Sequence, residues 1–188
     1  MKRLALLALA LAGCASGPLP PDWQTNARQA LESFKRNYLA GDTHSAETEF
    51  LRARSALAST GRGDLLARAE LTRCAVRTAS LELDDCPAFE ALRSEARSEE
   101  TGYADYLSGR AQRAASDDAL SRLVGLGVQF KTGRISPAGI TQAVEIASAQ
   151  GWRRPLLAWL GVQAKRAEDA GDSETAARIR RRIELIAG

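Results

Sequence analysis

Aromatic residues, histidine and long apolar runs are all scarce in this chain of 188 residues. Phe, Trp and Tyr together make up 5% of the sequence, which argues against a β-sandwich or barrel, because strands rely on aromatic and β-branched side chains. The single histidine excludes any metal site built on several histidines. No apolar run approaches the roughly 18 residues that a membrane-spanning helix needs.

What the chain does contain favours helices in one domain or one short helical array. Hydrophobic residues make up 45% and charged residues 26% of the sequence, so the chain can bury a core and does not belong to the disordered class. Alanine, the strongest helix former, is the most frequent residue. We therefore predict an all-α fold.

The first fourteen residues have the order of an export signal. A short basic start at Lys2 and Arg3 precedes an unbroken Leu/Ala run over 4–12, which ends in Leu11-Ala12-Gly13-Cys14. The run is too short to span a bilayer but suits the apolar part of a secretory signal. The last four residues resemble the lipobox of bacterial lipoproteins, in which the cysteine thiol accepts a diacylglycerol. An ordinary buried Leu/Ala helix with a chance cysteine is the alternative.

The lipoprotein resemblance implies a cellular location as well as a modification. Residues 1–13 would be a signal peptide, cleaved to leave acylated Cys14 at the mature N-terminus. Ala15 follows, where Asp would favour retention in the inner membrane of enterobacteria, so the resemblance implies a lipid anchor in the outer membrane, facing the periplasm. Residues 14–21 comprise the lipidated cysteine and a Pro-rich tether of roughly 20 Å. Residues 22–188 would form one α-helical, repeat-like domain.

Removal of the signal also changes the charge. The whole chain has a formal net charge of +3, and cleavage would remove the two positive charges of Lys2 and Arg3. A nearly neutral mature chain gives no electrostatic reason to expect a nucleic-acid partner.

Two cysteines, Cys74 and Cys86, remain after the signal. Paired cysteines usually form a disulfide in the oxidising compartment that an exported chain enters. Closing so short a loop would stabilise the fold by about 3 kcal/mol in the chain-entropy model. We predict a disulfide that joins two consecutive helices, with two buried free thiols as the alternative.

The two cysteines and one distant histidine lack the spacing of a zinc site, so no metal or cofactor is expected.

Residues 22–188 contain the start and stop signals of eight or nine helices. Aspartates and a Ser-Pro pair stand at expected helix starts, and glycines follow expected helix ends. No segment shows sustained strand alternation. Gly125 and Gly127 are expected to weaken the sixth helix. The predicted helices are 22–40, 42–59, 64–80, one starting at 85–87, one containing 103–107, 118–130, one from 136 to a stop at 151, 153–170 and 171–187.

The second predicted helix resembles the second helix of a tetratricopeptide repeat. Gly41 is followed by Ala46, Phe50 and Ala53 at the family's spacings of five, nine and twelve residues. The first helix matches less well, and the middle of the chain does not follow a 34-residue period. The resemblance implies antiparallel helical hairpins, with Phe50 filling the space toward the third helix and Glu47 on the opposite face. A generic helical bundle is the alternative.

The repeat resemblance also implies a function. The family's groove pattern falls on Arg28, Lys35 and Tyr38 as candidate partner-binding residues. We expect a membrane-tethered, non-enzymatic module for protein interaction or assembly in the cell envelope, with an envelope protein as its partner. An alternative is an envelope enzyme or regulatory subunit acting on peptidoglycan or glycan, which needs two acids facing each other in a pocket. A carrier of a small apolar ligand would instead need a closed apolar cavity.

Candidate catalytic groups are isolated in the sequence. His44 stands in the first turn of a predicted helix without an evident nucleophile or oxyanion donor nearby. The acidic pairs at 84–85 and 99–100 are interpreted as solvated helix ends. No catalytic residue is therefore assigned, and the chain is predicted not to be an enzyme.

Overall fold

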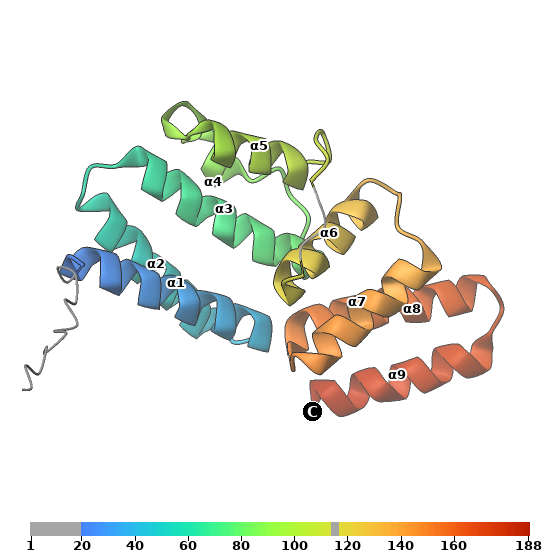
Figure 1. Cartoon of the computed structure of the whole chain (residues 1–188). Helices are drawn as coiled ribbons and strands as arrows, with labels where there is room; N and C mark the ends of the chain where they lie inside the picture. Colours follow the sequence, from blue (N-terminus) through green and yellow to red (C-terminus); the bar gives the residue numbers. More distant parts are fainter. Residues whose placement is uncertain (1–19, 114–116) are drawn as a thin grey trace, which may run out of the picture.

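The computed structural model describes residues 20–113 and 117–188, and this part of the chain is helical throughout, without strands (Figure 1). The predicted all-α class is therefore confirmed. The predicted signal peptide, Cys14 and all of the tether except its last two residues lie outside the described residues. The elements in the described ranges are α1 (Asp22–Ala40), α2 (Thr43–Ala58), α3 (Gly63–Ala79), α4 (Pro87–Glu90), the short 3-10 helix η1 (Arg93–Glu95), α5 (Ser98–Leu107), α6 (Ala119–Lys131), α7 (Pro137–Ala149), α8 (Arg153–Asp169) and α9 (Ser173–Ala187).

Four of the predicted helix starts are real caps, whereas the expected cap at Asp22 is not, because α1 begins at Asp22 itself and has no side-chain cap hydrogen bond. The side chains of Asp42, Asp118, Ser136 and Asp172 each accept a hydrogen bond from the backbone N–H three residues later, which satisfies one of the free donors of a helix N-terminus. The expected cap at Asp64 is different, because α3 begins one residue earlier and the Asp64 carboxylate pairs with Arg62 and Arg97. Local capping chemistry therefore explains where four of the nine α-helices in the described ranges begin.

The α1–α2 hairpin has the buried face that the sequence indicates. Ala46, Phe50 and Ala53 are fully buried, and the Phe50 ring lies 5.0 Å from the ring of Phe34 on α1. Toward α3, the guanidinium of Arg73 lies 4.7 Å from the centre of the Phe50 ring. Phe50 therefore fills the space between the first three helices, as predicted.

Glu47 was predicted on the face of α2 opposite to Phe50, but it does not lie clear of the third helix. Its carboxylate pairs with the guanidinium of Arg73 on α3 at 2.9 Å, because this side of α2 also faces the third helix. Glu47 therefore takes part in the contact between α2 and α3.

Helix α3 is shared by two hydrophobic cores. It lies between the α1–α2 hairpin and helices α4 and α5, while α7, α8 and α9 form the far end of the molecule (Figure 1). Ala69 and Val76 pack into the core of α1 and α2, whereas Leu71 and Ala75 pack into the larger core that extends to α8. Both cores therefore depend on α3.

Gly127 lets α6 cross directly over α3. A Cβ atom at this position would overlap the carbonyl oxygen of Thr78, so no larger side chain fits without a shift of one helix. Gly127 was expected to destabilise α6, and the structure shows that the same residue allows α6 to approach α3 closely.

Helix α8 contacts both the end of α3 and the α1–α2 hairpin. Trp159 on α8 is fully buried and donates its indole N–H to the carbonyl of Ala79 at 3.0 Å. Arg154, at the start of α8, donates to the carbonyl of Tyr38 at 2.7 Å, to Thr43 at 2.6 Å and to Glu82 at 3.1 Å. These bonds bring α8 against the end of α1, more than a hundred residues earlier in the chain.

A helical bundle describes this arrangement. Antiparallel hairpins occur at the two ends, α1–α2 and α8–α9, but the short helices α4 and η1 separate them and α1 contacts α8. The tetratricopeptide-like arrangement therefore stays a prediction. Within the described ranges, no helix has both the length and the apolar character needed to cross a bilayer.

Candidate functional site

A cavity of about 890 Å³ lies between α3, α5 and α6. Its size is that of ligand-binding sites in proteins, which combine apolar walls with a few placed polar groups. The apolar part of its lining includes Leu71, Val76, Val124 and Leu126. The polar part is made by side chains that the helices bring together from distant parts of the sequence.

Glu100 is the buried acidic group of this cavity. Its side chain lines the cavity, the residue is only 7% exposed, and its Oε2 atom is buried without a hydrogen-bond partner among the described residues. The interpretation of this residue as a solvated helix end is therefore wrong. Glu100, Ala104 and Leu107 form the buried stripe of α5, so the carboxylate occupies an apolar position at helical spacing, which was the signal in the sequence that could have located it.

The position of Glu100 in its helix favours its charge but provides no donor. It lies in the first turn of α5, where the helix dipole stabilises an anion. A buried acceptor without a partner nevertheless costs free energy, and more so when it is charged. An ammonium, a guanidinium or another hydrogen-bond donor placed in the cavity would remove this cost.

Two tyrosines follow Glu100 along α5 and line the same cavity. The rings of Tyr103 and Tyr106 lie 5.8 Å apart, and the guanidinium of Arg113 lies 5.1 Å from the centre of the Tyr103 ring. Burial, and secondarily Tyr106, raises the pKa of Tyr103 to about 12, and burial also raises the pKa of Tyr106. Both phenols are therefore neutral donors at physiological pH.

Gly125 on α6 makes room for one of these phenols. A Cβ atom at Gly125 would lie 3.0 Å from the hydroxyl oxygen of Tyr106, which is closer than most real contacts. Gly125 thus has a role in the shape of the cavity, which its predicted effect on helix stability did not suggest.

Two arginines at the rim of the cavity are available to an anion. Arg68 on α3 and Arg122 on α6 are both exposed and both line the cavity. Within residues 20–113 and 117–188, neither guanidinium has an ion pair or a hydrogen bond. The other three cations of the lining have contacts of their own: Lys35 pairs with Glu32 at 2.8 Å, Arg113 lies over the ring of Tyr103, and Arg134 donates to the Thr132 hydroxyl at 3.0 Å.

The structure does not bring the predicted groove residues Arg28, Lys35 and Tyr38 together. Lys35 lines the cavity, whereas Arg28 is exposed in a separate depression of about 600 Å³ along the outer face of α1. Tyr38 is buried, with the guanidinium of Arg154 lying 4.2 Å from its ring centre, and burial raises its pKa above the ordinary value. Tyr38 packs at the contact of α1 with α8 and offers no free surface.

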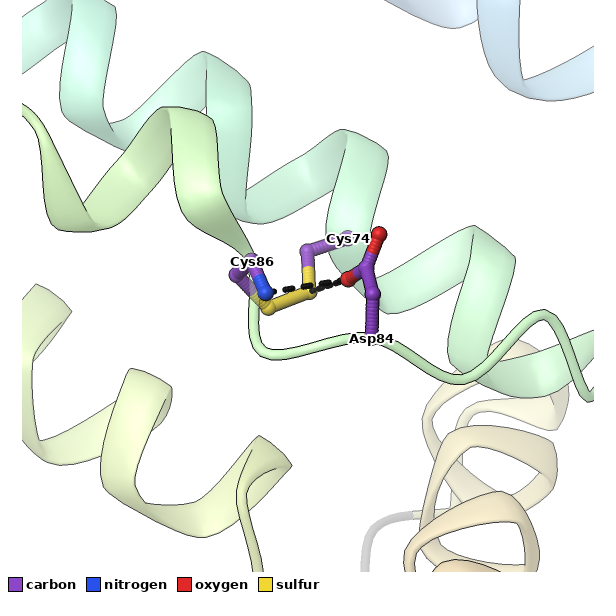
Figure 2. Close-up of side chains that lie close together, drawn as sticks. All are labelled: Cys74, Asp84 and Cys86. Atoms are coloured by element: carbon purple, nitrogen blue, oxygen red, sulfur yellow. Dashed lines mark hydrogen bonds between the residues drawn. A yellow bond between two sulfur atoms is a disulfide. The ribbon is translucent and has the colours of Figure 1, made fainter.

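The predicted disulfide between Cys74 and Cys86 is present and joins α3 to the start of α4, with a Cα–Cα distance of 5.7 Å (Figure 2). Asp84 lies beside it and accepts the backbone N–H of Cys86 at 2.9 Å. These three residues bring possible metal-ligand atoms within 4.8 Å of one another. The two sulfurs are bonded to each other, however, and the Asp84 carboxylate pairs with Arg77 at 2.7 Å. The cluster holds the connection between α3 and α4.

No protein-family model, curated protein or solved structure matches the chain. The chemistry of the cavity therefore has to be inferred from its own residues. It combines a buried carboxyl group with two neutral phenols and, at its rim, two guanidinium groups that have no ion pair within the described residues. Such a lining suits a ligand that carries both a positive and a negative group.

Proposed function

We propose that the chain is a lipid-anchored protein of the outer membrane, facing the periplasm, whose helical domain binds another envelope protein without chemical catalysis. The lipobox-like residues Leu11-Ala12-Gly13-Cys14 support the anchor. The Pro-rich residues that follow support a domain held within roughly 20 Å of the membrane. The cavity between α3, α5 and α6 is the binding site in this proposal.

One observation carries the binding role. Glu100 is buried in the cavity and its Oε2 atom has no partner in the described part of the chain, although polar groups inside folded domains are nearly always hydrogen-bonded. A bound partner that supplies the missing donor explains why an unpaired acid lies on the buried stripe of α5.

A photo-crosslinking amino acid can test this role in the native host. Position 129 suits it, because Gln129 is exposed and lines the cavity, and Ser55 on α2 provides an exposed control position outside the cavity. We expect a single envelope protein to be captured from position 129 and not from position 55. Identical products from both positions, or none from position 129, would show that the cavity does not bind a partner protein.

The anchor is tested separately. We expect Cys14→Ser to abolish acylation and to move the protein out of the membrane fraction. If the variant stays in the membrane fraction with an unchanged processed mass, the lipid anchor is wrong, whatever the cavity binds.

An enzyme acting on peptidoglycan or glycan is the second candidate function. It is favoured by one observation, namely that Glu99, Glu100 and Asp118 all line the cavity, and glycoside hydrolysis uses a pair of carboxyl groups. Asp118 already accepts the backbone N–H of Ser121 at 2.8 Å as a helix cap. Soluble fragments released from purified peptidoglycan by the full chain, and not by Glu100→Gln, would support this function over the binding module.

The cavity does not favour a carrier of an apolar ligand. That function predicts a closed apolar cavity, whereas Arg68 and Arg122 line this one and are exposed to solvent.

A further inference from the structure

We propose that the cavity receives a lysine side chain from an acidic segment of the partner protein, with the lysine ammonium on Glu100 and the flanking acidic groups on Arg68 and Arg122. The inference rests on the proposed function, in that it names the chemistry by which the binding module recognises its partner. It assigns a role to four side chains from three helices, namely Arg68, Glu100, Tyr106 and Arg122.

The buried carboxylate requires a donor. Glu100 has neither a hydrogen bond nor an ion pair within the described residues, and Oε2 is shielded from solvent. A ligand that fills the cavity without a donor would also exclude the remaining water from this carboxylate, which raises the cost of its burial. An ammonium group supplies three donors and the opposite charge.

The walls of the cavity suit a lysine stem. Leu71, Val124 and Leu126 line the cavity together with Glu100, so a side chain that reaches the carboxylate passes apolar surface. Lysine has four methylene groups below a compact cationic head, and such stems pack along apolar surface while the head finds a polar partner. The ring of Tyr106 follows Glu100 on the same helix and can attract the ammonium further, whereas the ring of Tyr103 already has the guanidinium of Arg113 at 5.1 Å.

The rim selects acidic residues beside the lysine. Arg68 and Arg122 are exposed and without ion pairs within the described ranges, so their charge repels a ligand that is only cationic. Carboxylates on either side of the lysine turn this repulsion into attraction and add specificity against basic segments. A polyamine or a polybasic segment would therefore bind poorly, although each carries the ammonium that Glu100 needs.

The experiment measures the binding of end-blocked fluorescent pentapeptides to the full chain purified in detergent. One peptide has a central lysine between acidic residues, a second has norleucine in place of the lysine, and a third keeps the lysine between serines. Norleucine retains the apolar stem and removes only the charge. We expect each change to weaken binding by about tenfold or more, since a charge-assisted hydrogen bond contributes that much.

Variants assign each preference to its residue. Glu100→Gln should abolish the preference for lysine over norleucine, while Arg68→Gln and Arg122→Gln should reduce the preference for acidic flanks and leave the preference for lysine. Glu145→Gln, an exposed position on α7 outside the cavity lining, should leave both preferences unchanged. Thermal unfolding of each variant checks that it is folded.

The outcomes separate the inference from the proposed function. If wild type does not prefer lysine, or if Glu100→Gln keeps the full preference, the lysine assignment is wrong even when position 129 captures a partner protein. If a soluble peptidoglycan stem peptide binds in a Glu100-dependent way and the pentapeptides do not, a cell-wall peptide replaces the protein segment as the ligand. If position 129 captures no protein, the proposed function itself fails.

Discussion

Two glutamates are buried in the described part of the molecule, and they differ in what is held against them. Glu70 on α3 is 5% exposed, and its carboxylate pairs with the guanidinium of Arg54 on α2 at 3.3 Å. Glu100 on α5 is 7% exposed and has no such partner. Burial alone therefore does not identify a functional group. The unsatisfied carboxylate lies in a cavity, and the satisfied one lies where α2 and α3 pack.

The surroundings of the two residues differ in the same way. Near Glu70, Arg73 pairs with Glu47 and covers the ring of Phe50, so cations and anions are matched within the packing of α2 and α3. Near Glu100, Arg68 and Arg122 have no partner within the described ranges. We infer that the α1–α2–α3 region is built for stability and that the α3–α5–α6 region carries function, and four predictions test this contrast.

The largest effect is expected from Phe50→Ala in the first region. Truncating a buried phenylalanine commonly lowers the free energy of unfolding by about 3–5 kcal/mol, and Phe50 contacts both Phe34 and Arg73. Urea denaturation of the full chain measures the change. Ser55→Ala, an exposed position on the same helix, should change it by less than about 0.5 kcal/mol. Equal losses from the two variants would contradict the assigned face of α2.

A smaller loss is expected from Arg54→Ala, which leaves Glu70 buried without its cation. An unsatisfied buried acceptor costs about 1–3 kcal/mol, so the free energy of unfolding should fall by that amount at neutral pH. The double variant with Glu70→Gln should recover part of the loss, because a neutral amide is cheaper to bury than an unpaired carboxylate. No recovery would mean that Arg54 acts through packing alone.

Glu100→Gln should hardly lower the free energy of unfolding, in contrast to the changes around Glu70. It removes a buried charge that has no partner, and it also removes a small favourable interaction with the dipole of α5. We expect the free energy of unfolding to rise or to change by less than about 1 kcal/mol. A loss comparable to that of Arg54→Ala would show that Glu100 has a structural partner and would remove the basis of the proposed site.

The smallest effect concerns the acid dependence of stability. Hydrogen bonds from Arg62 and Arg97 lower the pKa of the half-buried Asp64 from 3.8 to about 2. The contribution of Asp64 is therefore present above pH 3.8 and is lost as the pH falls toward 2. Burial outweighs the nearby Arg54 and Arg73 and raises the pKa of Glu70. Ionised Glu70 therefore opposes folding, and this penalty disappears as the pH falls. Denaturation curves between pH 2 and 5 should be flatter for Asp64→Asn than for wild type, and a curve of unchanged slope would contradict this pairing.

The sequence predicts the helices and the first hairpin well because the signals are local. Caps such as Asp42 and the spacing of Ala46, Phe50 and Ala53 depend on residues within one or two turns. The disulfide was also predictable, since only two cysteines remain after the signal. Its partners are only twelve residues apart in sequence.

The candidate site was mostly not predictable, because it depends on how helices cross. Arg68 and Glu100 line one cavity only because α5 packs on α3, and Arg122 lines it too because Gly127 allows α6 to cross α3. The groove residues were placed by the repeat pattern, and Tyr38 is instead covered by Arg154 from α8, a contact that no local pattern indicates. One signal was overlooked, namely that Glu100 shares the helical spacing of Ala104 and Leu107.

The contrast between the two buried glutamates can be measured directly in the native host. The photo-crosslinking residue is placed at position 129, and the yield of the captured envelope protein is compared for wild type, Glu100→Gln and Glu70→Gln at equal protein levels. We predict that Glu100→Gln abolishes capture and that Glu70→Gln, which also neutralises a buried glutamate, retains it. Equal capture by wild type and Glu100→Gln would contradict the claim that the unpaired carboxylate of α5 recognises the partner.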